Sequence, residues 1–108
     1  MNFKIEVTSY FRKQAKPLLK KYPSLKLELD ELFKLLMDKP TTGVSLGNHC
    51  FKIRIAIGSK GKGKSGGARI ITHIQVHQSK VYMLSIYDKS EQKTLVDKEL
   101  QMLLKLIP

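Results

Sequence analysis

The chain has 108 residues, 42% of them hydrophobic, which is enough for one folded domain and too little for two. Its 20 Lys and Arg residues outnumber 9 Asp and Glu residues, and the resulting formal net charge of +11 favours a polyanionic partner such as nucleic acid. No apolar run approaches the roughly 18 residues that span a membrane, and the N-terminus lacks the pattern of a signal peptide, so a membrane or secreted protein is not expected.

The charges are segregated along the chain. All acidic residues lie within residues 6–38 and 88–99, whereas residues 39–87 contain eight basic residues and no acidic one. This middle segment therefore carries +8 of the net +11. A generally basic, soluble surface would not predict such a distribution, so the segment is expected to face the anionic partner.

The first elements are a strand and a helix. Residues 3–7 alternate apolar and charged side chains, which predicts a half-buried strand. Thr8 or Ser9 then offers an N-cap for a helix that runs to about residue 21. Pro17 lies inside this helix and is expected to kink or split it.

A second helix follows after a turn at residues 22–24, where Ser24 is a further candidate N-cap. Residues 39–40 end it, and residues 41–49 are expected to form a loop. The two helices are joined by a short turn, so we expect a hairpin that packs on one face of a sheet. The apolar residues with helical spacing are Leu25, Leu29, Leu32, Phe33 and Leu36.

Three strands are predicted in the second half, at residues 51–57, 68–76 and 80–88. The first alternates apolar residues with Lys52, Arg54 and Ala56, and the second is rich in β-branched residues. The single cysteine, Cys50, has no disulfide partner in the chain, which favours a reducing compartment such as the cytoplasm and a small buried residue.

Residues 58–65, GSKGKGKS, match the G-x-x-x-x-G-K-[ST] pattern of a nucleotide-binding P-loop. A P-loop needs a helix directly after it, whose N-terminus faces the phosphates. A strand is predicted there instead, so no nucleotide cofactor is expected. Two interpretations remain open: a flexible solvated loop, or a basic loop whose glycines let a phosphate backbone approach closely.

The strands at 51–57 and 68–76 are expected to form a hairpin in which Ile57 pairs with Ala68 and Lys52 lies opposite His73. One face is then apolar and packs under the helices. The other face is cationic and suits a phosphate backbone. It carries Lys52, Arg54, Arg69 and His73, and Lys60, Lys62 and Lys64 project from the connecting loop at its rim.

The last segment predicts a third helix. Thr94 precedes Asp97 by three residues, which is typical of a capping box, and Val96, Leu100, Leu103, Leu104 and Ile107 follow at helical spacing. Its apolar face either completes the core or binds a partner.

The second half also resembles a known family. FKIRIAIGSKGKGKSGGARIITHI, followed by VYMLSIYDKSEQKTL, is similar to toxins of the RelE/HigB type, particularly the HigB-like branch. The matching blocks are Lys52–Ala56, Gly61–Gly67, Ala68–Ile70 and Leu84–Glu91, in that order, and the N-terminal half matches by layout. The resemblance implies a bacterial type II toxin that a cognate antitoxin neutralises. Its implied activity is cleavage of messenger RNA on the ribosome, without a metal or other cofactor.

Carried over by position, the resemblance places Lys52 and Arg54 on the RNA-facing surface, with Arg69 after the loop and Lys89 after the last strand. Cleavage through a ribose 2′-OH needs a base, stabilisation of a phosphorane and an acid. We expect Arg69 to contact the phosphorane, since a guanidinium can contact two oxygens, and Arg54 to assist it. Lys52 would act as base if neighbouring cations lower its pKa. On this hypothesis, Arg69→Ala abolishes cleavage and preserves the fold.

Two further candidates have open alternatives. His73 would act as acid or base, although the family more often has tyrosine there and a plain surface residue is the alternative. Tyr87 would stack on a base or donate a proton, unless it only packs.

The sequence therefore predicts a single α+β domain over residues 1–108. Two N-terminal helices pack on a four-stranded, mainly antiparallel twisted sheet, and a C-terminal helix follows. A ribosome-dependent mRNA endoribonuclease toxin is the leading functional hypothesis. A gyrase inhibitor of the ParE-like kind and a plain RNA-binding module of the same fold are the alternatives.

Overall fold

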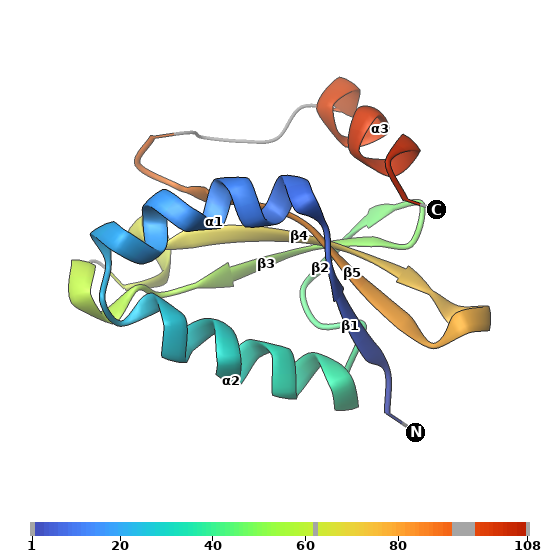
Figure 1. The fold of residues 1–108 in the computed structure, drawn as a ribbon, viewed down its shortest axis with the longest axis horizontal. Coiled ribbons are helices and arrows are strands. Elements are labelled where there is room, and N and C mark those ends of the chain that lie inside the picture. Colours follow the sequence, from blue (N-terminus) through green and yellow to red (C-terminus); the bar gives the residue numbers. More distant parts are fainter. Residues whose placement is uncertain (1, 62, 92–96, 108) are drawn as a thin grey trace.

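The computed structural model describes residues 2–61, 63–91 and 97–107 and contains a five-stranded sheet of order β1-β5-β4-β3-β2 (Figure 1). β1 runs parallel to β5, and the other neighbouring strands are antiparallel. The predicted α+β fold is confirmed. The strands are β1 (Lys4–Val7), β2 (Val44–Gly47), β3 (Cys50–Ile55), β4 (Ala68–Gln75) and β5 (Lys80–Asp88).

The sheet has one strand more than the four expected, because β2 lies within the predicted loop 41–49. All four residues of β2 are exposed, and the strand pairs only with β3 at the edge of the sheet. Val44 and Leu46 alternate with Ser45 and Gly47, but the run has only four residues and lies between Gly43 and Asn48, residue types that favour a loop.

The helix α1 (Ser9–Lys21) begins at the predicted N-cap Thr8, whose Oγ1 accepts a hydrogen bond from the N–H of Phe11 (3.1 Å). It continues through Pro17 as one helix, so the expected split is wrong. Pro17 lies on the exposed side, while Phe11 and Leu18 on the opposite side are buried. Packing of that face on the sheet outweighs the loss of one backbone hydrogen bond.

The helix α2 (Leu25–Asp38) completes the predicted hairpin on one face of the sheet. Its predicted apolar positions are buried, with Phe33 partly so. Ser24 makes no capping hydrogen bond, contrary to expectation. Its hydroxyl instead donates to Glu28 Oε1 within α2 (3.1 Å) and accepts from the N–H of Ser59, in the loop between β3 and β4 (2.9 Å).

The helix α3 (Asp97–Lys105) packs on the opposite face of the sheet, so the sheet is covered on both sides. Leu100 and Leu103 are buried there against Ile71 and Leu84. The apolar face of this helix therefore completes a second core. The proposed capping residue Thr94 and the predicted apolar residue Val96 lie outside the described residues. No helix in the described ranges has the length and hydrophobicity to cross a membrane.

The hairpin of β3 and β4 is shifted by two residues from the expected register. Lys52 pairs with Ile71, Arg54 with Arg69, and Ile55 with Ala68. The expected pairing of Lys52 with His73 is therefore wrong. A shift of two residues keeps every side chain on its predicted face but changes its neighbours.

Gly67, the residue before β4, is a glycine for a steric reason. A Cβ at this position would overlap the carbonyl oxygen of Ile55 and lie 3.0 Å from the Cα of Ala56. The absence of a side chain at Gly67 thus allows the end of β3 and the start of β4 to approach closely. The atoms that a Cβ would meet belong to the backbone and cannot move aside easily.

Gly67→Ala should consequently destabilise the protein by about 3 kcal/mol, because an overpacked backbone contact must open. Gly61→Ala is the matched control. Gly61 has a left-handed φ of 74° and open space around it, so only about 1 kcal/mol of backbone strain is expected there. Urea unfolding of the two variants measures the difference, and equal losses would contradict the steric explanation.

Candidate functional site

Three predicted site residues form one row across the sheet. Arg54 on β3 pairs with Arg69 on β4, which pairs with Tyr87 on β5. Residues directly opposite one another on neighbouring strands share a face, and this face is the one opposite the α1–α2 hairpin. Lys52 lies one row further along, beside Ile71. The structure thus places Lys52, Arg54 and Arg69 on one face, as predicted, and adds Tyr87 to them.

These side chains differ in exposure. Arg54 is exposed, whereas Arg69 and Tyr87 are each only 4% exposed. The Arg69 guanidinium donates hydrogen bonds to three carbonyl oxygens, those of Lys64 (2.8 Å), Ala68 (3.3 Å) and Ser65 (3.5 Å). Arg69 therefore holds the second half of the loop, and Arg54 presents its charge to solvent.

The first half of the loop is fixed to the start of α2. The N–H of Gly58 donates to Glu28 Oε2 (2.7 Å), and the N–H of Ser59 donates to Ser24 Oγ (2.9 Å). Short 3-10 helices at Gly58–Lys60 and Lys64–Gly66 give these two halves defined shapes. The loop is thus anchored at both ends rather than freely solvated, and β4 follows it, so the helix required by a P-loop is not formed.

Lys60 is buried at the end of this first half. Its Nζ forms an ion pair with Asp88 Oδ1 (2.5 Å) and donates to Ser90 Oγ (2.9 Å). The Lys60 side chain is 9% exposed and that of Asp88 is fully buried. Tyr22, from the turn between α1 and α2, donates its hydroxyl to Asp88 Oδ2 (2.6 Å). One carboxylate therefore ties the helical hairpin, the basic loop and the end of β5 together.

The environment of Asp88 shifts its pKa. Burial by itself would raise the pKa, but hydrogen bonds from Lys60, Tyr22 and Ser90 outweigh burial and hold it well below the ordinary value of 3.8. Asp88 is consequently ionised at neutral pH, as an ion pair with Lys60 requires.

The three loop lysines thus have different positions. The expectation that Lys60 projects from the loop rim is wrong, because Asp88 binds it in the interior. Lys64 is exposed, as expected. Lys62 lies outside the described residues. Lys89 follows Asp88 and is half-buried, and its N–H donates to the carbonyl of Gly67 (3.0 Å), which places it beside the same loop.

The comparison with protein families adds one finding to this geometry. The family model described as the RelE toxin of the RelE/RelB toxin-antitoxin system matches residues 8–107. The chain belongs to the RelE toxin family. Membership implies an antitoxin as partner, and it confirms the resemblance seen in the sequence at the level of the family.

A solved structure supports the RelE fold. The chain is similar to the toxin RelE of E. coli in the free state, in a variant with two arginines replaced by alanine. The TM-score is 0.63 at 13% sequence identity, and the match covers 100% of both chains. At this identity the likeness concerns the fold.

His73 lies apart from the row in this RelE-family toxin. Four residues separate it from Arg69 along β4, or about 13 Å of extended strand. It is buried, with its Nδ1 3.5 Å from Cys50 Sγ and its Nε2 3.1 Å from Gln75 Nε2. Burial lowers its pKa below the ordinary value; a backbone hydrogen bond to Asn48 opposes this, and His49 adds to it.

Around His73 lies a pocket of about 430 Å³ between the β2–β3 turn and the end of α3. Asn48, His49, Gln101 and Leu104 also line it. His73 thus belongs to a different part of the surface from Arg54. Among the described residues, no group of three or more His, Cys, Asp or Glu side chains could hold a metal ion.

Asp88 was not predicted from the sequence as a partner of the basic loop. The signal was its place in the chain: it is the first acidic residue after the 49-residue acid-free segment 39–87. A strand that ends on such a residue, near a loop of lysines, is a candidate for a buried ion pair. Tyr22 carried no comparable signal, because only the tertiary fold brings it to Asp88.

Cys50 is fully buried, and burial raises the pKa of its thiol to about 11. At pH 8 the folded protein should react with a disulfide reagent at least 100-fold more slowly than the unfolded chain, since the thiolate is the nucleophile. Absorbance of the released aromatic thiolate measures both rates. Rapid reaction of the folded protein would show that β3 opens at this position.

Proposed function

We propose that this RelE-family toxin is a metal-independent endoribonuclease of the cytoplasm that cleaves messenger RNA bound to the ribosome. The observation that supports it is the row of Arg54, Arg69 and Tyr87, with Lys52 in the next row and a basic loop at its end. The similarity of the loop sequence to the HigB-like branch is part of the proposal.

The exposures of these residues suggest separate roles. Arg54 is exposed and would contact the scissile phosphate and stabilise the phosphorane, since a guanidinium binds two phosphate oxygens. Lys52 lies about 7 Å along the strand; in its uncharged form it would accept the 2′-OH proton, and a water molecule would protonate the 5′-oxygen as it leaves. Arg69 would support Arg54 without contacting the phosphate: it would hold the loop in place and make the electrostatic potential at the site more positive. Cationic side chains supply the charge that a metal ion would otherwise bring.

Tyr87 and Lys89 flank Asp88 at the end of β5. In this proposal Lys89 contacts the RNA backbone next to the loop, together with Lys64 and Lys62. Tyr87 is buried, so its ring would support Arg69 rather than stack on an exposed base. His73 would serve the neighbouring pocket, where it would meet the RNA or ribosome outside the cleavage site.

Induced expression of the chain tests this proposal. Growth should stop, and mapping of messenger RNA 5′ ends should reveal new ends at a constant position within codons. Arg54→Ala should remove these ends, and Lys39→Ala, at the C-terminal end of α2, should not. Growth arrest without new ends would contradict the ribonuclease activity, and inhibited DNA supercoiling in that case would identify the gyrase inhibitor.

A further inference from the structure

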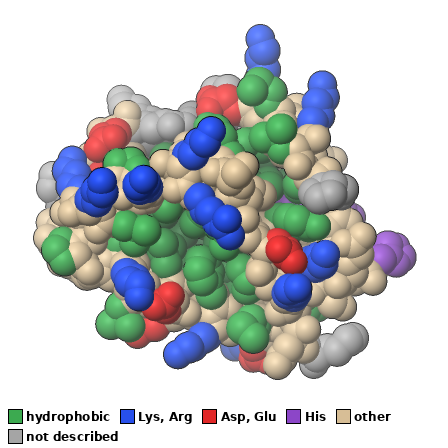
Figure 2. Space-filling view, viewed as in Figure 1, with side chains coloured by type: hydrophobic (Ala, Val, Ile, Leu, Met, Phe, Trp, Pro, Cys, Tyr) green, Lys and Arg blue, Asp and Glu red, His purple; other side chains and the backbone are tan. Residues whose placement is uncertain are grey.

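The pocket around His73 lies on the same face of the sheet as the Arg54 row, at the end where β4 turns into β5. Figure 2 shows histidine side chains at the edge of the molecule where this turn lies in Figure 1. Three parts of the fold form the pocket: the β2–β3 turn, the last residues of β4, and α3 with the residues after it. Its volume of about 430 Å³ is enough for one flat group of a ligand.

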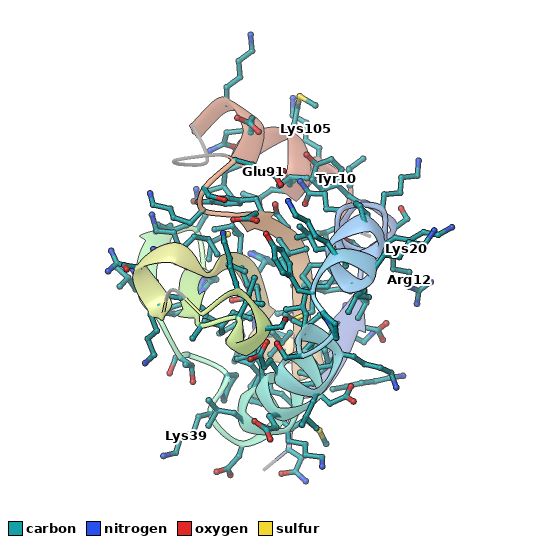
Figure 3. The ribbon with its side chains drawn as sticks, turned by 90° about the vertical axis from the view of Figure 1, so that its left-hand side faces the viewer. Tyr10, Arg12, Lys20, Lys39, Glu91 and Lys105 are labelled. Atoms are coloured by element: carbon teal, nitrogen blue, oxygen red, sulfur yellow. The ribbon has the colours of Figure 1, made fainter. Side chains whose placement is uncertain are left out.

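The wall of the pocket on the α3 side is held in place by packing. Leu100 and Leu103 of this helix are buried against the sheet, and Tyr10 packs against the same cluster. Figure 3 shows Tyr10, near the start of α1, beside α3. The same helix contributes Gln101 and Leu104 to the pocket. These two residues are therefore in position without a ligand.

The chemistry of the pocket differs from that of the rest of this basic protein. Among the described residues, no Lys, Arg, Asp or Glu lines it. Burial lowers the pKa of His73, so its ring is neutral at pH 7. The pocket has three amide side chains, those of Asn48, Gln75 and Gln101. Such a lining does not select a phosphate, whereas an amide, with a donor beside an acceptor, matches the hydrogen-bonding edge of a nucleobase.

His73 fixes the orientation of the Gln75 amide. The Nε2 atoms of the two side chains are 3.1 Å apart. The Gln75 nitrogen can only donate, so His73 Nε2 accepts, and the hydrogen of the neutral ring lies on Nδ1 and is donated to the backbone of Asn48. Gln75 thus uses one of its two N–H groups on His73. The other N–H and Oε1 remain for a ligand.

The pocket also offers flat and apolar contacts. The exposed His49 lines it, and Leu104 and Ile107 are half-buried on the α3 side. Proteins recognise unstacked RNA bases by stacking them on aromatic side chains, including histidine, and by hydrogen bonds to their edges. The pocket has the groups for both kinds of contact.

The pocket is within reach of an RNA strand bound at the Arg54 row. Arg54, Lys52 and Cys50 are alternate residues of β3 on this face, and Cys50 pairs with His73 at the pocket. From Arg54 to Cys50 the strand extends about 13 Å, with Lys52 halfway. An RNA whose phosphate contacts Arg54 and whose ribose meets Lys52 would bring a neighbouring base to the pocket.

We propose that this pocket binds one unstacked nucleobase of the messenger RNA near the cleaved bond, held by the amides of Gln75 and Gln101 and stacked on His49. The inference rests on the proposed function, since it takes the bound RNA to be the substrate. Gln75 and His49 are then specificity-determining residues, which fix where along the messenger RNA the Arg54 row acts.

Binding of uncleavable RNA tests the pocket separately from the ribonuclease activity. A labelled hexanucleotide with 2′-O-methyl riboses lacks the attacking hydroxyl, and a second oligonucleotide has the same backbone without bases. The variant His49→Ala/Gln75→Leu is compared with His77→Ala/Gln78→Leu, which makes the same changes at exposed residues between β4 and β5, outside the pocket. Circular dichroism checks that both variants are folded.

Fluorescence anisotropy should show that the unaltered protein binds the oligonucleotide with bases about 10-fold more tightly than the one without, the size of effect of one stacked base. This ratio should fall below about 2-fold in the pocket variant and stay near 10-fold in the control variant. Equal affinity of the unaltered protein for both oligonucleotides would overturn the proposal, and so would equal losses in the two variants. A nucleoside monophosphate that binds as tightly as the hexanucleotide would make the pocket a site for free nucleotides instead.

Mapping of messenger RNA 5′ ends distinguishes a base of the messenger RNA from one of ribosomal RNA. The new ends should show a nucleotide preference at a fixed distance from the cut, and the pocket variant should lose this preference while cuts at other positions appear. Fewer cuts with an unchanged preference would overturn the assignment to messenger RNA and indicate a ribosomal base. Base-dependent binding without any new ends would contradict the ribonuclease activity and leave the base site standing.

Discussion

Lys60→Met should lower the free energy of unfolding by about 3 kcal/mol, because it leaves the buried carboxylate of Asp88 without its cation. Tyr22 and Ser90 continue to donate hydrogen bonds to that carboxylate, so the loss falls at the lower end of the range for a broken buried ion pair. Urea unfolding measures it. Lys64→Met is the matched control: the same change at an exposed lysine of the same loop should cost less than 0.5 kcal/mol.

A second substitution separates charge from packing. Asp88→Asn removes the charge that needs a counterion, so Lys60→Met/Asp88→Asn should be more stable than Lys60→Met alone. If the double variant is instead less stable by the sum of the two single losses, the two side chains do not act as a pair.

The stability of the protein in acid should also depend on the interaction of Asp88 with Lys60. The pKa of Asp88 is lower in the folded protein than its ordinary value of 3.8, so the unfolded chain binds more protons in acid. The stability that Asp88 contributes is complete above about pH 4 and is lost as the pH falls toward the folded pKa. Urea midpoints between pH 2.5 and 6 should therefore fall more steeply in the unaltered protein than in Asp88→Asn.

Arg69→Ala should have two effects at once. If the proposed ribonuclease activity holds, cleavage should fall by about 100-fold, the size of effect expected when the loss of a supporting contact misplaces the reacting groups by about 1 Å. The loop should also lose the donor to three of its carbonyl oxygens, at a cost of about 3 kcal/mol. The variant is thus expected to keep the fold, as predicted from the sequence, but with a lower stability.

Arg54→Ala is the comparison that separates the two effects. Arg54 is exposed, so its loss should reduce cleavage by a similar factor while the free energy of unfolding changes by less than 0.5 kcal/mol. Cleavage of ribosome-bound messenger RNA and urea unfolding give the two numbers for each variant. Full cleavage by Arg54→Ala would remove it from the site, and unchanged stability of Arg69→Ala would show that its hydrogen bonds to the loop are dispensable.

The long strands were predictable because both of their faces are buried, which gives nearly continuous runs of apolar and β-branched residues. β4 and β5 lie in the interior of the sheet, and their bounds were predicted within one residue. Their pairing with β3 was harder, since alternation has a period of two and cannot distinguish registers that differ by two residues. The close contact of Gly67 with β3 is available only from the folded chain.

The sequence was sufficient to predict which residues give the site its positive charge and on which face of the sheet they lie. It was also sufficient to predict the family, from the order of the matching sequence blocks. Alternation alone placed Arg54 and Arg69 on the face opposite the helices. Their exposure was not predictable, because it depends on where the loop folds back: Arg69 binds the loop backbone and Arg54 does not.

The sequence by itself determined the α+β class, the family and the basic character of the segment between residues 39 and 87. These properties follow from local periodicity, residue order and charge, which need no knowledge of distant contacts. The tertiary structure alone decided which lysine of GSKGKGKS is available to a ligand. Lys60 and Lys64 are equivalent in that stretch, but Asp88, 28 residues from Lys60, draws one of them into the interior, since a buried carboxylate requires a cation beside it.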